Sequence, residues 1–218
     1  LSVLEAARHA EGLQHLVYAS SSSVYGDKPL NGQGFREDEM VNKPVSLYAA
    51  TKASCELMSQ CYSSLYDMPQ TGLRFFTVYG PWGRPDMAYF SFTRKILAGE
   101  PIEVYGEGKM ARDFTYIDDI VDGIIGALDH PPEIGTHRVL NIGDSRPVGL
   151  MDMIEALENA IGHKAEKIMR PMQAGDVTAT YADISQLNAL CGYHPKVMLA
   201  DGLQRFADWY KTYHGTKR

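Results

Sequence analysis

Tyr48 and Lys52 are residue types that can move a proton, and they lie four positions apart in the segment SLYAATKA (46–53). In a helix this spacing brings both side chains to one face. A tyrosine phenol ionises near pH 10, and a neighbouring cation favours the charged form, so such a pair can supply a base near neutral pH. The spacing also arises by chance, so the pair alone equally fits an exposed helix without a catalytic role.

Four consecutive serines, Ser20–Ser23, precede this pair by about 25 residues in the segment ASSSSVYG (19–26). They end an apolar run, HLVYAS (15–20), that is typical of a buried strand. Their hydroxyls could simply satisfy backbone groups where the strand ends. Alternatively they form a bank of hydrogen-bond donors and acceptors at the edge of a sheet, and the nearby Tyr48–Lys52 pair favours this second interpretation.

The elements that must position these residues alternate between strands and helices. The sequence predicts strands at 15–20, 71–78, 102–106, 112–117, 138–143 and 165–170. It predicts helices at 1–12, 46–66, 88–98, 118–130, 149–161, 183–190 and 200–213. This alternation indicates an α/β fold with a largely parallel sheet. Because parallel strands end at a common edge, we expect Ser20–Ser23 and Thr77–Gly80 to converge there.

The composition limits the possible function classes. The chain has 218 residues, of which 44% are hydrophobic and 22% charged, as in an ordinary globular domain. A net charge of −6 argues against nucleic acid or an anionic membrane as a partner, and no apolar run reaches the roughly 18 residues of a membrane span. Three cysteines without paired spacing predict a reduced, cytoplasmic protein, and the scattered histidines show no metal-ligand spacing.

Five segments, in this order, resemble the extended short-chain dehydrogenase/reductase family, in particular its branch of sugar-nucleotide epimerases and dehydratases. They are YASSSSVYG (18–26), SLYAATK (46–52), LRFFTVYGP (73–81), ARDFTYIDD (111–119) and NIG (141–143). The resemblance implies a catalytic triad of Ser21, Tyr48 and Lys52. Tyr48 would be the acid/base, Lys52 would hold the nicotinamide ribose of NAD, and Ser21 would bind the hydroxyl that is oxidised. The NAD-binding residues would be Ser20, Tyr48, Lys52, Phe76 and Val78.

The same resemblance implies how the chain is divided. We expect a Rossmann-like parallel sheet whose N-terminal half is absent, with a smaller C-terminal substrate-binding lobe. Residues 1–80 would be the C-terminal part of the NAD-binding Rossmann domain, and 81–218 mostly the nucleotide-sugar-binding lobe, with about 112–143 returning to the sheet. The family's GxxGxxG fingerprint does not occur, and the first residues read as the interior of a helix. We therefore expect an N-terminal part that completes the NAD site.

The residues at the sugar end indicate the branch of the family. Dehydratases and uronate decarboxylases of this family carry an acidic residue just before the ValTyrGly segment, where this chain has Ser22 and Ser23. Without that base, epimerisation at C4 is favoured over dehydration. The segment RFFTVYGPWGRPDMA (74–88) resembles the group of UDP-glucuronate 4-epimerases. In that group Ser22, Ser23 and Thr77 would receive the sugar carboxylate with Arg84 close by, although Arg84 could also be a surface loop charge.

Three further residues would bind the nucleotide by the same resemblance. Arg112 would fork two oxygens of the diphosphate, unless it forms a salt bridge with Asp113 or Asp119. Tyr105 would stack on uracil or be a core aromatic, and Asp176 would accept from the uridine ribose or be a loop acid.

The leading hypothesis is therefore an NAD-dependent nucleotide-sugar 4-epimerase that interconverts UDP-glucuronate and UDP-galacturonate through a 4-keto intermediate. The rival hypotheses are a catalytically inactive fragment that acts as a nucleotide-sugar-binding or oligomer-contact module, and another epimerase or dehydratase of the same family. The resemblance further implies a homodimer whose contact is formed by the helix that carries Tyr48 together with the first helix.

Overall fold

Three strands form the parallel sheet at one end of the molecule, in the order β1-β2-β6. The computed structural model describes residues 1–27, 33–172 and 178–215. Strand β1 spans Leu16–Ser21, β2 spans Gln70–Phe75 and β6 spans His137–Ile142. Five of the six residues of β2 are buried, as expected for a central strand that is covered on both faces. The predicted α/β class with a parallel sheet is confirmed.

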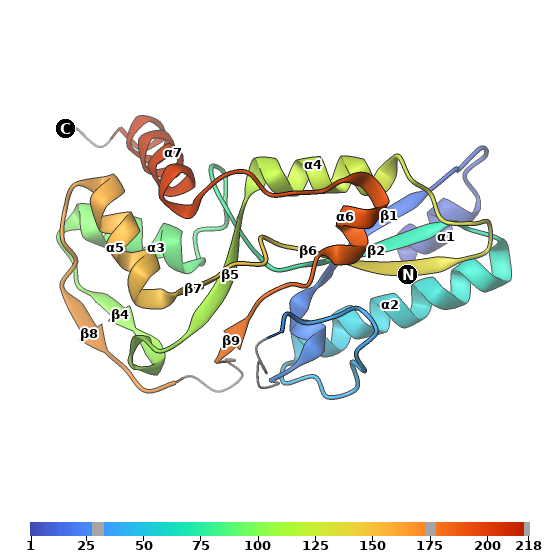
Figure 1. Ribbon diagram of the computed structural model, residues 1–218, viewed down its shortest axis with the longest axis horizontal. Coiled ribbons are helices and arrows are strands. Elements are labelled where there is room, and N and C mark those ends of the chain that lie inside the picture. Colours follow the sequence, from blue (N-terminus) through green and yellow to red (C-terminus); the bar gives the residue numbers. More distant parts are fainter. Residues whose placement is uncertain (28–32, 173–177, 216–218) are drawn as a thin grey trace.

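Helices cover both faces of this sheet (Figure 1). Helix α2 (Leu47–Tyr66) lies on one face, with the short helix α1 (Ser2–Arg8) packed beside it. Helix α4 (Ile117–Leu128) lies on the other face, next to α6 (Ser185–Cys191). The 3₁₀ turn η1 (Ser22–Tyr25) follows β1 directly. The serine run therefore lies at the carboxyl end of β1, as the sequence predicts.

The predicted strand 71–78 is divided at Phe76, and its two halves belong to different sheets. The Phe76 amide donates to the Ile142 carbonyl at 3.1 Å, which ends the first sheet there. Strand β3 (Thr77–Tyr79) then pairs in parallel with β5 (Ala111–Tyr116). Two short strands that the sequence analysis did not predict also join β5, namely β7 (Pro147–Gly149) and β9 (Ala179–Thr180). After residue 80 the chain contributes β5 to the second sheet and then returns to the first sheet with β6. The predicted domain boundary at residue 80 stays a prediction.

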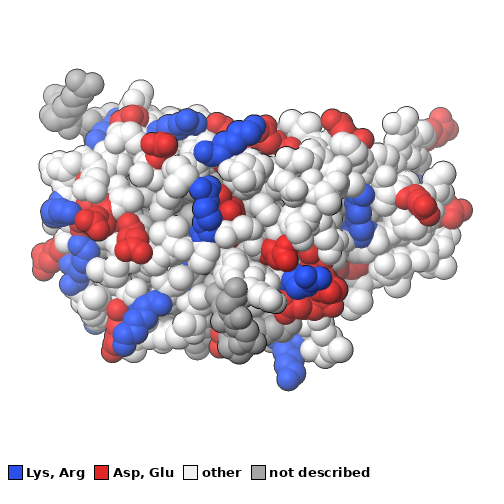
Figure 2. All heavy atoms as spheres, in the orientation of Figure 1, with Lys and Arg blue, Asp and Glu red and all other residues white. Residues whose placement is uncertain are grey.

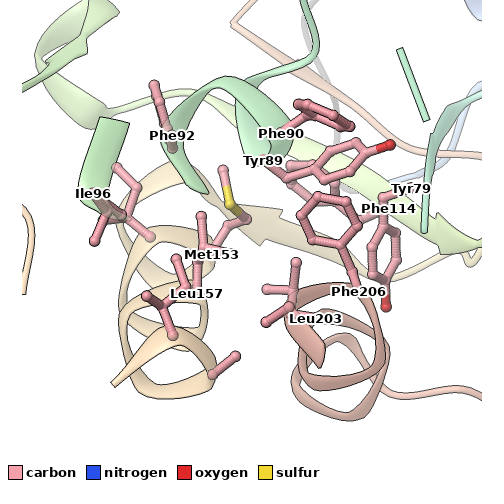
Figure 3. Packing of buried hydrophobic residues seen from close by; sticks show 14 of the residues in the cluster. Tyr79, Tyr89, Phe90, Phe92, Ile96, Phe114, Met153, Leu157, Leu203 and Phe206 are labelled. Atoms are coloured by element: carbon pink, nitrogen blue, oxygen red, sulfur yellow. The ribbon is translucent and has the colours of Figure 1, made fainter. Parts of the chain in front are cut away.

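The second half of the chain packs around aromatic side chains (Figure 3). Helices α3 (Ala88–Ala98), α5 (Leu150–Ile161) and α7 (Leu199–Tyr213) enclose this core. Strands β4 (Ile102–Val104) and β8 (Lys167–Met169) pair at its edge. The turn η2 (Tyr105–Gly108) follows β4 in the chain. The rings of Tyr89 and Phe206 meet edge to face with 4.8 Å between their centroids. Helix α7 also contacts the loop that follows β3, through Trp82.

The surface carries mixed charge, and the face in Figure 2 shows Lys and Arg interspersed with Asp and Glu without a broad field of one sign. Among the described residues, the helices are too short or too polar for any of them to cross a membrane.

Asp113 on β5 is a buried carboxylate that holds three chain segments together. Its oxygens accept from the backbone amides of Asp144 at 2.6 Å, Ser145 at 3.0 Å and Ala182 at 2.9 Å. These bonds fix the loop after β6 and the segment after β9 against β5, beside Arg112. Burial raises the pKa of the Asp113 carboxyl to about 6, so the group is mainly ionised at neutral pH and accepts from all three amides.

Asp113→Asn is expected to lower the free energy of unfolding by about 2–4 kcal/mol, because the new amide group would face backbone donors and leave them unsatisfied. Thermal or urea unfolding measures this loss, with Asp122→Asn as an exposed control that should change the stability by less than about 0.5 kcal/mol. The native pKa lies above the ordinary value of 3.8, so the native state binds this proton more tightly than the unfolded chain does. The resulting stabilisation is complete below a pH of about 3.8 and is lost as the pH rises through about 6. A variant that unfolds at the wild-type temperature with an unchanged pH profile would contradict this role.

Candidate active site

A cleft of about 750 Å³ opens at the carboxyl ends of β1 and β2. It is bounded by the serine turn (Ser21 and the 3₁₀ turn η1 that it caps), by the first turns of α2 and by the chain from Phe75 to Arg84. Nine of the predicted site residues line it: Ser20, Ser21, Ser22, Tyr48, Lys52, Phe76, Thr77, Val78 and Arg84. The two loops that the sequence analysis expected to converge therefore meet in one cleft.

Tyr48 and Lys52 lie on the same face of α2 at its N-terminal end. Ser46 caps the helix by accepting from the Ala49 amide at 3.1 Å, which fixes the first turn. The Lys52 ammonium lies 5.8 Å from the centroid of the Tyr48 ring and donates to the Ala19 carbonyl at 2.9 Å. This second contact holds the lysine between the tyrosine and strand β1. The Tyr48 side chain is half-exposed to the cleft, where a ligand could reach its hydroxyl.

The other two tyrosines that line the cleft are Tyr79 and Tyr89, and both are buried. Burial raises the pKa of each phenol above its ordinary value, so both stay protonated near neutral pH. Their hydroxyls donate to backbone carbonyls, of Leu199 and Gly80 respectively. Of these three tyrosines, only Tyr48 combines access to the cleft with an adjacent cation.

The serine turn orients the Ser21 hydroxyl. Ser21 caps the 3₁₀ turn and accepts from the backbone amide of Ser23 at 3.2 Å and from the Ser23 hydroxyl at 2.9 Å. Both contacts use acceptor positions of Ser21, which leaves its own proton for a ligand oxygen. Ser20 points the other way and donates to Glu56 inside the protein at 2.6 Å. Ser22 lines the cleft, whereas the Ser23 hydroxyl contacts the Ser21 hydroxyl.

A second cavity of about 420 Å³ adjoins the cleft, because Thr77, Met87 and Tyr89 line both. Tyr105 and Arg112 line this second cavity. The Arg112 guanidinium donates to the Ala111 carbonyl at 2.9 Å and contacts the Thr178 carbonyl at 3.4 Å. The Tyr105 hydroxyl donates to Glu103 at 3.3 Å. An elongated ligand could therefore extend from Tyr48 past Thr77 to Arg112.

The two carboxylates considered as salt-bridge partners of Arg112 have other hydrogen-bond donors. Asp113 accepts from three backbone amides, and Asp119 accepts from the amides of Lys196 and Val197 at 3.0 Å each. Backbone amides thus engage both carboxylates, and Arg112 lies in the wall of the second cavity.

The loop from Gly80 to Met87 separates the two cavities and contains residues that the sequence analysis did not single out. Gly83 passes so close to Tyr89 that a Cβ at this position would lie 1.7 Å from the tyrosine hydroxyl, so only glycine fits. Trp82 packs on α7, with centroids 5.2 Å from the Trp209 ring and 4.7 Å from the Tyr213 ring. The local segment GPWGRP marks a turn, but the packing partners lie far along the chain.

Arg84 lies at the mouth of the cleft, where it forms an exposed ion pair with Asp86 at 3.3 Å. Such a pair contributes little to stability and leaves the guanidinium able to turn toward a ligand. Asp176 lies outside the described residues. Within the described part of the chain, no group of three or more histidine, cysteine or acidic side chains has the arrangement of a metal site.

Comparison with known proteins places these residues in a family context. The model of the NAD dependent epimerase/dehydratase family matches residues 1–143. A probable UDP-glucuronate 4-epimerase of Rhizobium meliloti (strain 1021) is 45% identical over 96% of this chain and 65% of its own length. UDP-glucuronate 4-epimerase 1 of Arabidopsis thaliana is 44% identical over 99% of this chain and 53% of its own length.

Among solved structures, the UDP-glucuronic acid 4-epimerase of Bacillus cereus, in complex with UDP-glucuronic acid and NAD, is similar to this chain with a TM-score of 0.89. The two are 38% identical, and the match covers 97% of this chain and 65% of that enzyme. The chain thus spans roughly half to two thirds of the length of these relatives.

Proposed function

The chain belongs to the NAD-dependent epimerase/dehydratase family, and from this premise we propose that it is a nucleotide-sugar 4-epimerase that interconverts UDP-glucuronate and UDP-galacturonate. The observation that carries the proposal is the cleft in which Ser21, Tyr48 and Lys52 converge and which continues to Arg112. The relatives that are UDP-glucuronate 4-epimerases support the choice of sugar.

Tyr48 acts as the acid/base of the reaction. With the Lys52 ammonium nearby, its phenol oxygen accepts the proton of the sugar O4 while Ser21 donates a hydrogen bond to the same oxygen. Bound NAD supplies the reversible hydride acceptor that this chemistry needs. Hydride would leave C4 as the 4-keto sugar forms and, after that sugar turns in the cleft, would return to the opposite face of C4 while Tyr48 returns the proton to O4.

The residues on the wall beside Tyr48 fit the nicotinamide half of NAD. Phe76 and Val78 supply an apolar surface for the ring, and Lys52 supplies a donor for the ribose hydroxyls. The Ser20 hydroxyl is engaged by Glu56, so Ser20 would contribute through its backbone. The sequence contains no GxxGxxG segment, so these residues account for one end of NAD only.

Hydroxyl groups and one arginine receive the sugar carboxylate in this proposal. Ser22 and Thr77 line the cleft, Ser23 adjoins them, and Arg84 lies at the mouth. In this proposal they face the carboxylate on C5 when C4 faces Tyr48. Because Ser22 and Ser23 take the place of a carboxylate base, removal of the C5 proton is disfavoured.

The second cavity receives the nucleotide. Arg112 binds the diphosphate, and Tyr105 stacks on uracil. Asp176 is proposed to accept from the uridine ribose. The proposed homodimer is supported by exposed Leu57 and Leu65 on α2 and by exposed Val3 on α1, and the cytoplasmic location stays a prediction.

Incubation of the protein with UDP-glucuronate and NAD tests the function. We expect UDP-galacturonate as the product, resolved by ion-exchange chromatography, and turnover of UDP-glucose slower by at least about tenfold because the carboxylate-binding groups stay unpaired. In heavy water the product should carry no deuterium at C5. Binding of UDP-glucuronate without any turnover would instead favour a nucleotide-sugar-binding module, and a dehydrated product would favour another member of the family.

A further inference from the structure

Glu56 and Arg74 form an ion pair inside the protein. Their side chains are 8% and 4% exposed, and the contact is a fork, with Arg74 Nε to Glu56 Oε1 at 2.9 Å and Arg74 Nη2 to Glu56 Oε2 at 2.8 Å. Burial alone would lower the pKa of Arg74, but its contacts with Glu56 and Tyr25 raise it above the ordinary value, so the guanidinium stays charged. A buried ion pair is often no more stabilising than apolar residues of similar volume, so stability alone does not explain it.

The pair connects α2 to strand β1 close to Ser21. Glu56 lies one helical turn after Lys52 and two turns after Tyr48, on the same face of α2. Its Oε1 accepts from the Ser20 hydroxyl at 2.6 Å, and Lys52 donates to the Ala19 carbonyl. Two consecutive residues of β1 are thus bonded to two consecutive turns of α2. This arrangement fixes how far α2 can slide along the strand.

Arg74 also holds the serine turn. Its Nη1 donates to the Tyr25 hydroxyl at 2.9 Å, and its guanidinium lies 4.8 Å from the centroid of the Tyr25 ring. Tyr25 is the last residue of η1, and its hydroxyl donates in turn to Asn141 on β6 at 2.7 Å. One guanidinium therefore contacts both the helix that carries Tyr48 and the turn that carries Ser21.

We propose that Glu56 and Arg74 are positioning residues that set the separation of the Tyr48 and Ser21 hydroxyls. This role rests on the proposed function only in that Tyr48 and Ser21 act on the substrate. Neither residue of the pair lines the cleft, so both act through α2 and the serine turn.

Glu56→Gln tests the proposal, because it keeps the volume and removes the charge that binds Arg74. We expect kcat for UDP-glucuronate to fall about 10–100-fold with KM changed less than about threefold, since small misplacements of reacting groups have effects of that size. The matched control is Glu158→Gln. Glu158 is a similarly buried carboxylate on α5, paired with Lys164 and Lys167 in the other half of the molecule. Its loss should leave kcat within about twofold of the wild type.

A milder variant and a second measurement separate positioning from unfolding. Ser20→Ala removes one bond to Glu56 and should lower kcat about 3–10-fold in a protein that stays folded at the assay temperature, since one hydrogen bond contributes only about 0.5–1.5 kcal/mol to stability. Amide hydrogen exchange should become faster in residues 19–25 and 47–56 of Glu56→Gln, and unchanged there in Glu158→Gln. This measurement requires no turnover.

The proposal is overturned if folded Glu56→Gln and Ser20→Ala both turn over at the wild-type rate, or if exchange in the serine turn and the start of α2 is unaffected. If the wild-type protein itself shows no turnover, the proposed function fails. In that case the exchange comparison alone decides the positioning role, with local acceleration supporting it and no local change overturning it.

Discussion

Tyr48→Phe is expected to lower the turnover of UDP-glucuronate by about 10³-fold or more, because in the proposed mechanism the phenol oxygen accepts and returns the O4 proton. The substitution removes one oxygen atom from a half-exposed side chain whose hydroxyl makes no hydrogen bond to another described residue, so α2 should stay folded. The helix keeps its Ser46 cap and the Lys52 contact with β1. Affinity for UDP-glucuronate should therefore fall by no more than about tenfold, since only one hydrogen bond to the ligand is lost.

The matched control is Tyr66→Phe, which removes the same atom from a partly exposed tyrosine at the far end of the same helix. Its turnover should equal that of the wild type. We would compare the wild type and both variants by three measurements. Chromatography gives the initial rates, isothermal titration gives the affinity for UDP-glucuronate, and far-UV circular dichroism gives the helix content. If Tyr48→Phe retained more than about a tenth of the wild-type rate, the proton would have to move through another group.

The positions of the proposed catalytic residues were predictable because the residues lie in short local patterns, and their roles follow from the resemblance to the family. Tyr48 and Lys52 are one helical turn apart, and Ser21 directly follows an apolar run, so the sequence predicts both the helix face and the strand end. The structure then places all three around one cleft. Local periodicity was sufficient here because a parallel sheet brings strand ends to the same edge.

The supporting contacts were not predictable in the same way. Arg74 reads as an isolated charge in a buried strand, and nothing near it in the chain identifies Glu56 as its partner. The break at Phe76 depends on the hydrogen bond to Ile142, which lies on a strand far along the chain. Trp82 likewise owes its position to two rings on α7. Such pairings depend on tertiary packing, which local propensity does not encode.

The role of Ser23 shows how the structure sharpens a residue that the sequence did identify. The sequence analysis assigned Ser23 to the sugar carboxylate along with Ser22. In the structure both its amide and its hydroxyl contact Ser21, so it also determines the direction of the Ser21 hydroxyl. The two roles compete, because a carboxylate only accepts hydrogen bonds and the Ser23 hydroxyl donates its single proton to Ser21, so Ser23 would have to turn its hydroxyl away from Ser21 to bind the sugar.

Arg112→Met is expected to weaken the binding of UDP by about 10–100-fold, because charge-assisted hydrogen bonds to phosphate contribute about 1.5–3 kcal/mol. UDP-glucuronate should lose affinity by the same factor, since the lost contact is to the part that both ligands share. The affinity of Arg112→Lys should lie between those of the wild type and Arg112→Met, because an ammonium keeps the charge but cannot form two parallel hydrogen bonds to the phosphate oxygens. Isothermal titration with each ligand gives these affinities.

Two control variants show whether Arg112→Met loses UDP affinity through a direct phosphate contact or through a lower positive charge on the protein as a whole. Lys109→Met removes an exposed cation from the turn just before β5, paired there with Glu107, and should leave UDP affinity within about twofold. Arg84→Met should weaken UDP-glucuronate but not UDP, because Arg84 is assigned to the sugar carboxylate at the opposite end of the ligand. If Arg112→Met bound UDP as tightly as the wild type, the second cavity would not be the nucleotide site. The direction of the sugar in the cleft, and with it the approach of C4 to Tyr48, would then have to be reversed.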